Sequence, residues 1–176
     1  RAGHEKKLME IFDIHSAALI LDTAEKRIIK TIAMVHGGRA ADGSKDTISS
    51  LPVKEPILGH NIRTRYLAAI LRFADELADD STRANRVACD LNIVGTDSQI
   101  YHDYSRALHS VNVEKDEETH GHKIMLCFEL LATEMEKTYS MGGISKYLLD
   151  EIYDRTLKME QERRYCMKFM LSLIHI

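Results

Sequence analysis

The chain has 176 residues, of which 44% are hydrophobic, and this is enough apolar material for one well-packed domain. Its formal net charge of -3 argues against a dedicated nucleic-acid surface, because such surfaces carry an excess of Lys and Arg. The longest nearly continuous apolar run, from Ile124 to Ala132, is too short to cross a bilayer, so we expect a soluble protein without a membrane partner.

The cysteines indicate the cellular compartment, and the two ends of the sequence indicate that it is a fragment. The cysteines are odd in number and widely spaced, and no secretory leader precedes them, which indicates free thiols in the cytoplasm. The chain opens at Arg1 instead of a methionine, which suggests that an upstream part is missing. Residues 171–176 match the translation of a common sequencing adapter, with a natural apolar helix end as the alternative, and we expect no functional role for them.

The amino-terminal part is expected to be helical, beginning with an apolar helix over residues 12–21. Asp22 followed by Glu25 is the pattern of a helix N-cap with its capping-box partner. One face of the helix after it then contains Ile28, Ile32, Val35 and His36, which follow the helical period. Gly37 and Gly38 are expected to end this helix.

Residues 37–56 are expected to form a long surface loop, because they contain both prolines of the chain and few apolar anchors. The loop and the last six residues should be the least ordered parts of the chain. Asn61 is predicted to cap the next helix, whose apolar stripe comprises Leu67, Ile70, Leu71, Ala74, Leu77 and Ala78. Asp75 projects roughly 95° from the centre of that stripe, which places it at the margin of the expected buried face.

The carboxy-terminal half changes pattern. Residues 100–104, 108–113 and 123–130 favour strands and predict a small antiparallel sheet. Gly142 and Gly143 then break the chain before a long helix from 144 to about 168, in which Ile144, Leu148 and Ile152 share a face. The predicted fold class is therefore α+β, mainly α. We expect one domain over residues 1–170, with a helical part over 1–90 and the sheet and terminal helix over 91–170.

The strongest local motif lies in residues 62–79, an apolar helix in which Leu71-Arg72 is followed by two apolar residues and Asp75. It resembles the last metal-ligand helix of HD-superfamily proteins, and more narrowly the subgroup found alone or fused to Hsp90-like ATPase modules. The resemblance includes Val35-His36-Gly37 and residues 147–156 and loosely covers residues 10–168.

This resemblance implies a helical, metal-dependent phosphohydrolase. In that superfamily a His, a His-Asp dyad and a late Asp bind one or two divalent ions (Mn, Fe, Co, Ni or Mg), which activate a water to attack phosphorus. By position, Asp75 matches the late Asp, and His36 matches a histidine that follows the dyad and is the candidate catalytic residue. His15 is a weaker candidate metal ligand. The implied partners are a small phosphorylated substrate, such as a nucleotide, and an Hsp90-like ATPase domain.

The dyad itself is the point of departure from the family. The only adjacent His-Asp pair, His102-Asp103, follows Asp75 and lies in a stretch predicted to be a strand, where the two side chains would point to opposite faces. We therefore expect the dyad upstream of Arg1 and the fragment alone to be inactive.

Each candidate functional residue also has a purely structural interpretation. Arg63 and Arg72 could hold substrate phosphates in two-point contacts, but pairing with carboxylates of their own helix is the alternative. Asp75 could instead form a structural ion pair with Arg72 or Arg83. His36 could be a buried histidine bound to helix-end carbonyls. The rival function is a non-catalytic nucleotide-sensing or regulatory module coupled to an ATPase domain.

Overall fold

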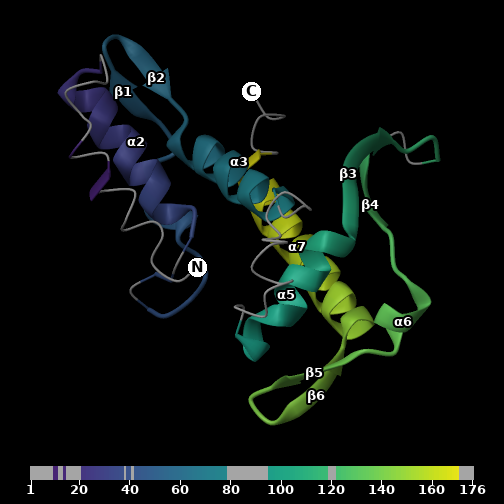
Figure 1. Cartoon of the computed structure of the whole chain (residues 1–176). Coiled ribbons are helices and arrows are strands. Elements are labelled where there is room, and N and C mark those ends of the chain that lie inside the picture. The colour runs from purple at the N-terminus through teal and green to yellow at the C-terminus, as the bar shows by residue number, and fades with distance from the viewer. Residues whose placement is uncertain are drawn as a thin grey trace. The chain divides into compact units, whose positions relative to one another are not determined.

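The computed structural model describes residues 10, 11, 14, 21–37, 39, 40, 42–78, 95–118 and 122–170, with the main chain alone at 96 and 97. This part of the chain is α+β and mainly helical, as predicted (Figure 1). Its elements are, in order, α2 (Thr23–Val35), the short 3-10 helix η1 (Ile48–Ser50), β1 (Glu55–Ile57), β2 (His60–Ile62), α3 (Thr64–Leu77), α5 (Thr96–Ala107), β3 (Leu108–Lys115), β4 (His122–Phe128), α6 (Ala132–Met135), β5 (Thr138–Met141), β6 (Ile144–Tyr147) and α7 (Leu148–Met170).

The chain divides into two compact units. Unit 1 comprises Arg1–Asp75 and Glu162–Ile176, and unit 2 comprises Glu76–Gln161. The expectation of one domain over residues 1–170 stays a prediction. None of the helices in the described ranges combines the length and the apolar character needed to span a membrane.

Helix α2 of unit 1 begins as its sequence predicts. The Asp22 side chain accepts a hydrogen bond from the backbone N–H of Glu25 at 2.8 Å, and the Glu25 side chain accepts one from the N–H of Asp22 at 2.9 Å. Both partners lie within four residues, so local sequence is sufficient to determine this helix start. Ile28 and Ile32 are buried, which confirms the predicted core face of the helix.

The segment from 42 to 56 differs from the loop that was expected. Ile48 in η1 is fully buried and Leu51 is 4% exposed, so the expectation of few apolar anchors is wrong. The segment ends in the β1–β2 hairpin, whose two-residue turn has positive φ at Leu58 (50°) and Gly59 (81°). This is the backbone combination that two-residue hairpin turns require.

Helix α3 buries a different face from the one its apolar pattern predicts. Asn61, the expected cap, lies in β2, and the helix begins at Thr64. The predicted core residues Leu67, Ile70 and Leu71 are 41%, 40% and 39% exposed, while Ala68, Ala69 and Arg72 are buried. The interior is therefore packed against small residues and one charged residue.

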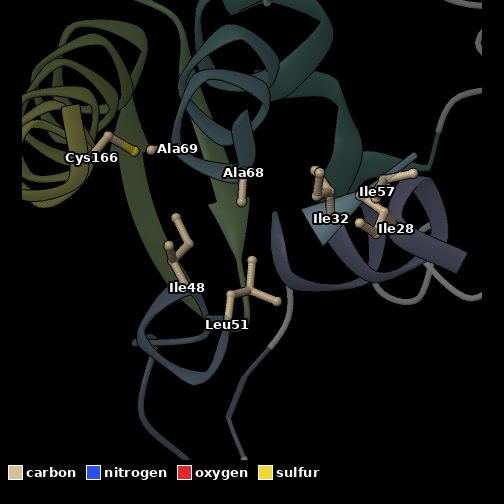
Figure 2. Packing of buried hydrophobic residues seen from close by; sticks show 8 residues of the cluster. All are labelled: Ile28, Ile32, Ile48, Leu51, Ile57, Ala68, Ala69 and Cys166. Atoms are coloured by element: carbon tan, nitrogen blue, oxygen red, sulfur yellow. The ribbon is translucent and has the colours of Figure 1, made fainter. Parts of the chain in front are cut away.

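The core of unit 1 joins four segments of the chain. Figure 2 shows Ile48 and Leu51 close to Ala68 of α3, and the Cys166 side chain of α7 directed at Ala69. Ile28, Ile32 and Ile57 complete the cluster. Small side chains on α3 allow close approach of the neighbouring backbone, so α3, the loop and the end of α7 are fixed together.

A helix of unit 2 lies where a strand was predicted. Residues 100–104 belong to α5, and Ile100 and Tyr104 are 0% and 1% exposed. Their spacing of four residues puts both on one helix face, which outweighs the β propensity of the individual side chains. The predicted strands at 108–113 and 123–130 do form a hairpin, as β3 and β4, which pair antiparallel from Leu108–Phe128 to Lys115–His122.

A second hairpin of unit 2 was missed. The Gly142-Gly143 pair, expected to break the chain before a helix, forms the turn between β5 and β6, with φ values of 56° and 85°. Two glycines between alternating residues are a hairpin signal that the sequence did contain. Ile144 consequently lies in β6, and the long helix α7 begins at Leu148. The core of this unit consists of Ile100, Tyr104, Leu108, Tyr139 and Leu148.

Candidate functional site

The candidate site residues of unit 1 lie around a buried polar cluster centred on Arg72. Its guanidinium donates from Nε to Glu162 Oε2 at 2.7 Å and from Nη2 to Glu162 Oε1 at 3.0 Å. Nη1 donates to the carbonyl of Lys45 at 3.0 Å and to the hydroxyl oxygen of Thr47 at 3.2 Å. The guanidinium also lies 4.6 Å from the ring centroid of Tyr165.

These contacts explain how a charged side chain can be 8% exposed. Burial by itself lowers the pKa of the Arg72 guanidinium, but the hydrogen bonds and charge of Glu162 outweigh it, so the pKa lies above its ordinary value. Four of the five N–H donors are used within the protein. This geometry gives Arg72 a structural role, and its carboxylate partner is Glu162 of α7. Substrate binding by Arg72 stays a prediction.

Thr47 extends the cluster to the end of α2. Its hydroxyl accepts from Arg72 and donates to the carbonyl of Val35, the last residue of α2, at 2.5 Å. Thr47 is buried, with an exposed fraction of 6%. A path of hydrogen bonds therefore runs from Glu162 through Arg72 and Thr47 to the residue before His36.

Asp46 and Tyr165 form the outer part of the same cluster. The Tyr165 hydroxyl donates to Asp46 Oδ1 at 2.7 Å and accepts from the N–H of Ile48 at 3.1 Å. Burial and the bond to Asp46 raise the pKa of Tyr165 to about 12. The same hydrogen bond is the main reason why the pKa of the Asp46 carboxyl lies below its ordinary value.

His36 and Asp75 occupy the ends of two helices that this cluster joins. His36 is the C-cap of α2 and is 9% exposed, and its Nδ1 donates to the carbonyl of Ala33. A proton on Nδ1 places the lone pair of the neutral ring on Nε2. This is the buried histidine bound to a helix-end carbonyl that was the alternative to a catalytic role. The same contact to a carbonyl also accompanies histidines that bind metals, so the catalytic assignment stays a prediction.

Asp75 lies in the last turn of α3 and is exposed. The motif Leu71-Arg72-x-x-Asp75 thus has two parts: Arg72 points into unit 1, and Asp75 follows one turn later in contact with solvent. Because Arg72 is fixed at several points, the backbone that carries Asp75 is fixed as well.

The other candidate residues from the sequence are Arg63, His15 and Arg83. Arg63 is half-buried, with its guanidinium 4.7 Å from the ring centroid of Tyr66. Its role in substrate binding stays a prediction. His15 and Arg83 lie outside the described residues.

The His102-Asp103 pair lies on α5, so the strand argument against it as a dyad is wrong. A different observation accounts for Asp103. Its carboxylate is buried and accepts from Tyr139 at 2.6 Å and from Lys137 at 2.7 Å, and it lies 3.1 Å from Arg106. Burial and the bond to Asp103 raise the pKa of Tyr139 above its ordinary value. Two cations and a hydroxyl therefore hold the Asp103 carboxylate inside unit 2.

The donor groups of the described residues fit a divalent ion in type but not in number. Carboxylate and imidazole groups such as Asp75 and His36 suit a divalent ion in type. Among the residues whose placement is described, no three His, Cys, Asp or Glu side chains gather closely enough to hold one. These residues by themselves therefore do not make a complete metal site.

The family model HD-CE matches residues 1–157, and the chain belongs to this family. The match includes the whole of α2, α3 and both hairpins of unit 2. Comparisons with curated proteins and with solved structures find no significant match.

Proposed function

We propose that this chain contributes to a metal-dependent phosphohydrolase acting on a phosphoester such as a nucleotide. Asp75 supplies one ligand of the divalent ion, Mn, Fe, Co, Ni or Mg, in keeping with the late Asp of the HD superfamily. The other ligands, including a His-Asp dyad, come from residues outside the described ranges. An attached Hsp90-like ATPase domain is a proposed partner.

One observation supports this proposal: near the end of α3, Arg72 is buried and Asp75 is exposed. Arg72 is held by Glu162 and Thr47, so the helix end is fixed, while Asp75 is exposed one turn later. The carboxylate that pairs with the buried guanidinium is that of Glu162 of α7. A fixed, exposed carboxylate in a segment matched by the HD-CE family suits a ligand.

The test uses the complete protein in which these residues occur. We expect hydrolysis of a chromogenic phosphodiester and of nucleotides to require an added divalent ion, and Asp75→Ala to lose both bound metal and activity. Glu76→Ala is the matched control, because Glu76 is the next carboxylate on α3 and pairs with Lys158 at 2.7 Å. Its metal content should equal that of the wild type.

Asp75→Ala should melt near the wild-type temperature because the side chain is exposed. If the wild-type protein binds no divalent ion and hydrolyses nothing, the phosphohydrolase proposal fails. Nucleotide binding without turnover would then favour the regulatory module.

A further inference from the structure

The path of hydrogen bonds through Thr47 joins the ends of the two helices that carry the candidate site residues. Thr47 is not part of either helix and lies in the segment between them. Its hydroxyl accepts from Arg72 Nη1 at 3.2 Å and donates to the carbonyl of Val35 at 2.5 Å. Arg72 is one turn before Asp75, and Val35 immediately precedes His36.

The polarity of this path is determined along its whole length. The guanidinium can only donate, so the Thr47 oxygen must accept from it, and the single hydroxyl hydrogen is left for Val35. At its other end the guanidinium is anchored by two contacts to Glu162. Because each group has one orientation that satisfies its neighbours, a displacement at one helix end strains the hydrogen bonds that lead to the other.

We propose that Thr47 is a positioning residue that couples the end of α2 to the end of α3 and so holds His36 in a fixed relation to α3. This inference rests on the proposed function in assigning His36 and the end of α3 to one site. The coupling itself is a property of unit 1 and can be measured in the absence of any ligand. Thr47 acts in this proposal through Val35 and Arg72, to which its hydroxyl is bonded.

The experiment compares two buried threonines whose hydroxyls bond to different parts of unit 1. Thr47→Val removes the hydroxyl with little change in volume. Thr64→Val is the matched control, since Thr64 is also buried and also donates to a backbone carbonyl, that of Pro52, at 2.5 Å. Thr64 contacts neither α2 nor Arg72 by a hydrogen bond in this structure, so its loss affects stability without affecting the coupling.

We expect Thr47→Val to accelerate amide hydrogen exchange about tenfold both at residues 33–37 and at residues 70–75. Thr64→Val should leave both segments near the wild-type rates. In the active protein, Thr47→Val should lower kcat about tenfold with KM little changed, because misplacement of reacting groups acts mainly on the transition state. Thr47→Ser, which keeps the hydroxyl, should restore exchange rates and kcat.

The outcomes separate this inference from the proposed function. Faster exchange at residues 33–37 alone, or equal effects of the two valine variants, would overturn the coupling. Coupling that is seen by exchange but leaves kcat unchanged in an active protein would overturn the positioning role. If the wild-type protein is inactive and binds no metal, the proposed function fails and the positioning role fails with it, while the exchange data still decide the coupling.

Discussion

Arg72 and Glu162 are 90 positions apart in the sequence and form a two-point ion pair in the interior of unit 1, with N–O distances of 2.7 and 3.0 Å. A planar guanidinium matches a carboxylate in this way better than a lysine could. If this guanidinium is to be buried with its counter-charge, it must lie on the side of α3 that meets Glu162, so the pair favours the burial of that face.

Breaking this pair should be costly. We expect Glu162→Ala to lower the free energy of unfolding by roughly 3 to 5 kcal/mol, because it leaves a buried guanidinium without its counter-charge. Urea denaturation measures this directly. For comparison, Glu76→Ala removes the more exposed pair with Lys158 and should cost only about 1 kcal/mol or less. Similar losses in the two variants would contradict the assignment of Arg72 as a buried structural residue.

The segment before β1 should contribute to stability in proportion to its buried side chains. Ile48→Ala should lower the free energy of unfolding by roughly 2 to 5 kcal/mol, because the side chain is fully buried. Val53→Ala in the same segment should change it by about 0.5 kcal/mol or less, since Val53 is 57% exposed. Equal, small effects would mean that the segment is a loosely held loop, as its sequence suggested.

The Asp46–Tyr165 hydrogen bond should give the stability of unit 1 two pH limits. The pKa of Tyr165 is raised to about 12, so its contribution is complete below the usual value of 10 and is lost as pH rises towards 12. The pKa of Asp46 is lowered, so its contribution is complete above the usual value of 3.8 and is lost as pH falls below it.

Tyr165→Phe removes the donor and should flatten the stability profile at both limits. Denaturation at a series of pH values, together with titration of the phenolate absorbance, measures the two effects. An unchanged alkaline limit in this variant would show that Tyr165 is not the group responsible.

Two elements whose stabilising partners are close along the chain could be predicted from local sequence. The Asp22 and Glu25 capping box and the β3–β4 hairpin were predicted correctly, since their partners are separated by a few residues or by one polar turn. The helix α5 was missed because strand propensity was weighed above the spacing of Ile100 and Tyr104, although the four-residue period was visible.

The buried face of α3 could not have been predicted from its own residues. Leu67, Ile70 and Leu71 form the more apolar side, so periodicity alone selects them. The observed interior contains Arg72 instead, because Glu162 supplies its counter-charge from 90 positions away. For the candidate site, the motif located the helix of Asp75 but could not tell whether Arg72 faces a substrate or the core.

The His102-Asp103 pair has the composition of a dyad and lies on helix α5. The structure assigns Asp103 to a cluster in which its carboxylate accepts from Tyr139 and Lys137. Asp103→Asn replaces one acceptor oxygen by an amide that can only donate. We expect the free energy of unfolding to fall by roughly 2 to 3 kcal/mol, the range for hydrogen bonds to charged groups. Lys137 and Arg106 are 38% and 41% exposed in their side chains, so water can solvate them and limit the loss.

His102→Asn should have a much smaller effect, because His102 is only half-buried. Metal content and activity of the complete protein should be unchanged in His102→Asn. If both variants instead lose bound metal while unfolding at the wild-type denaturant concentration, His102 and Asp103 are ligands, and the site lies in unit 2 and not at the end of α3.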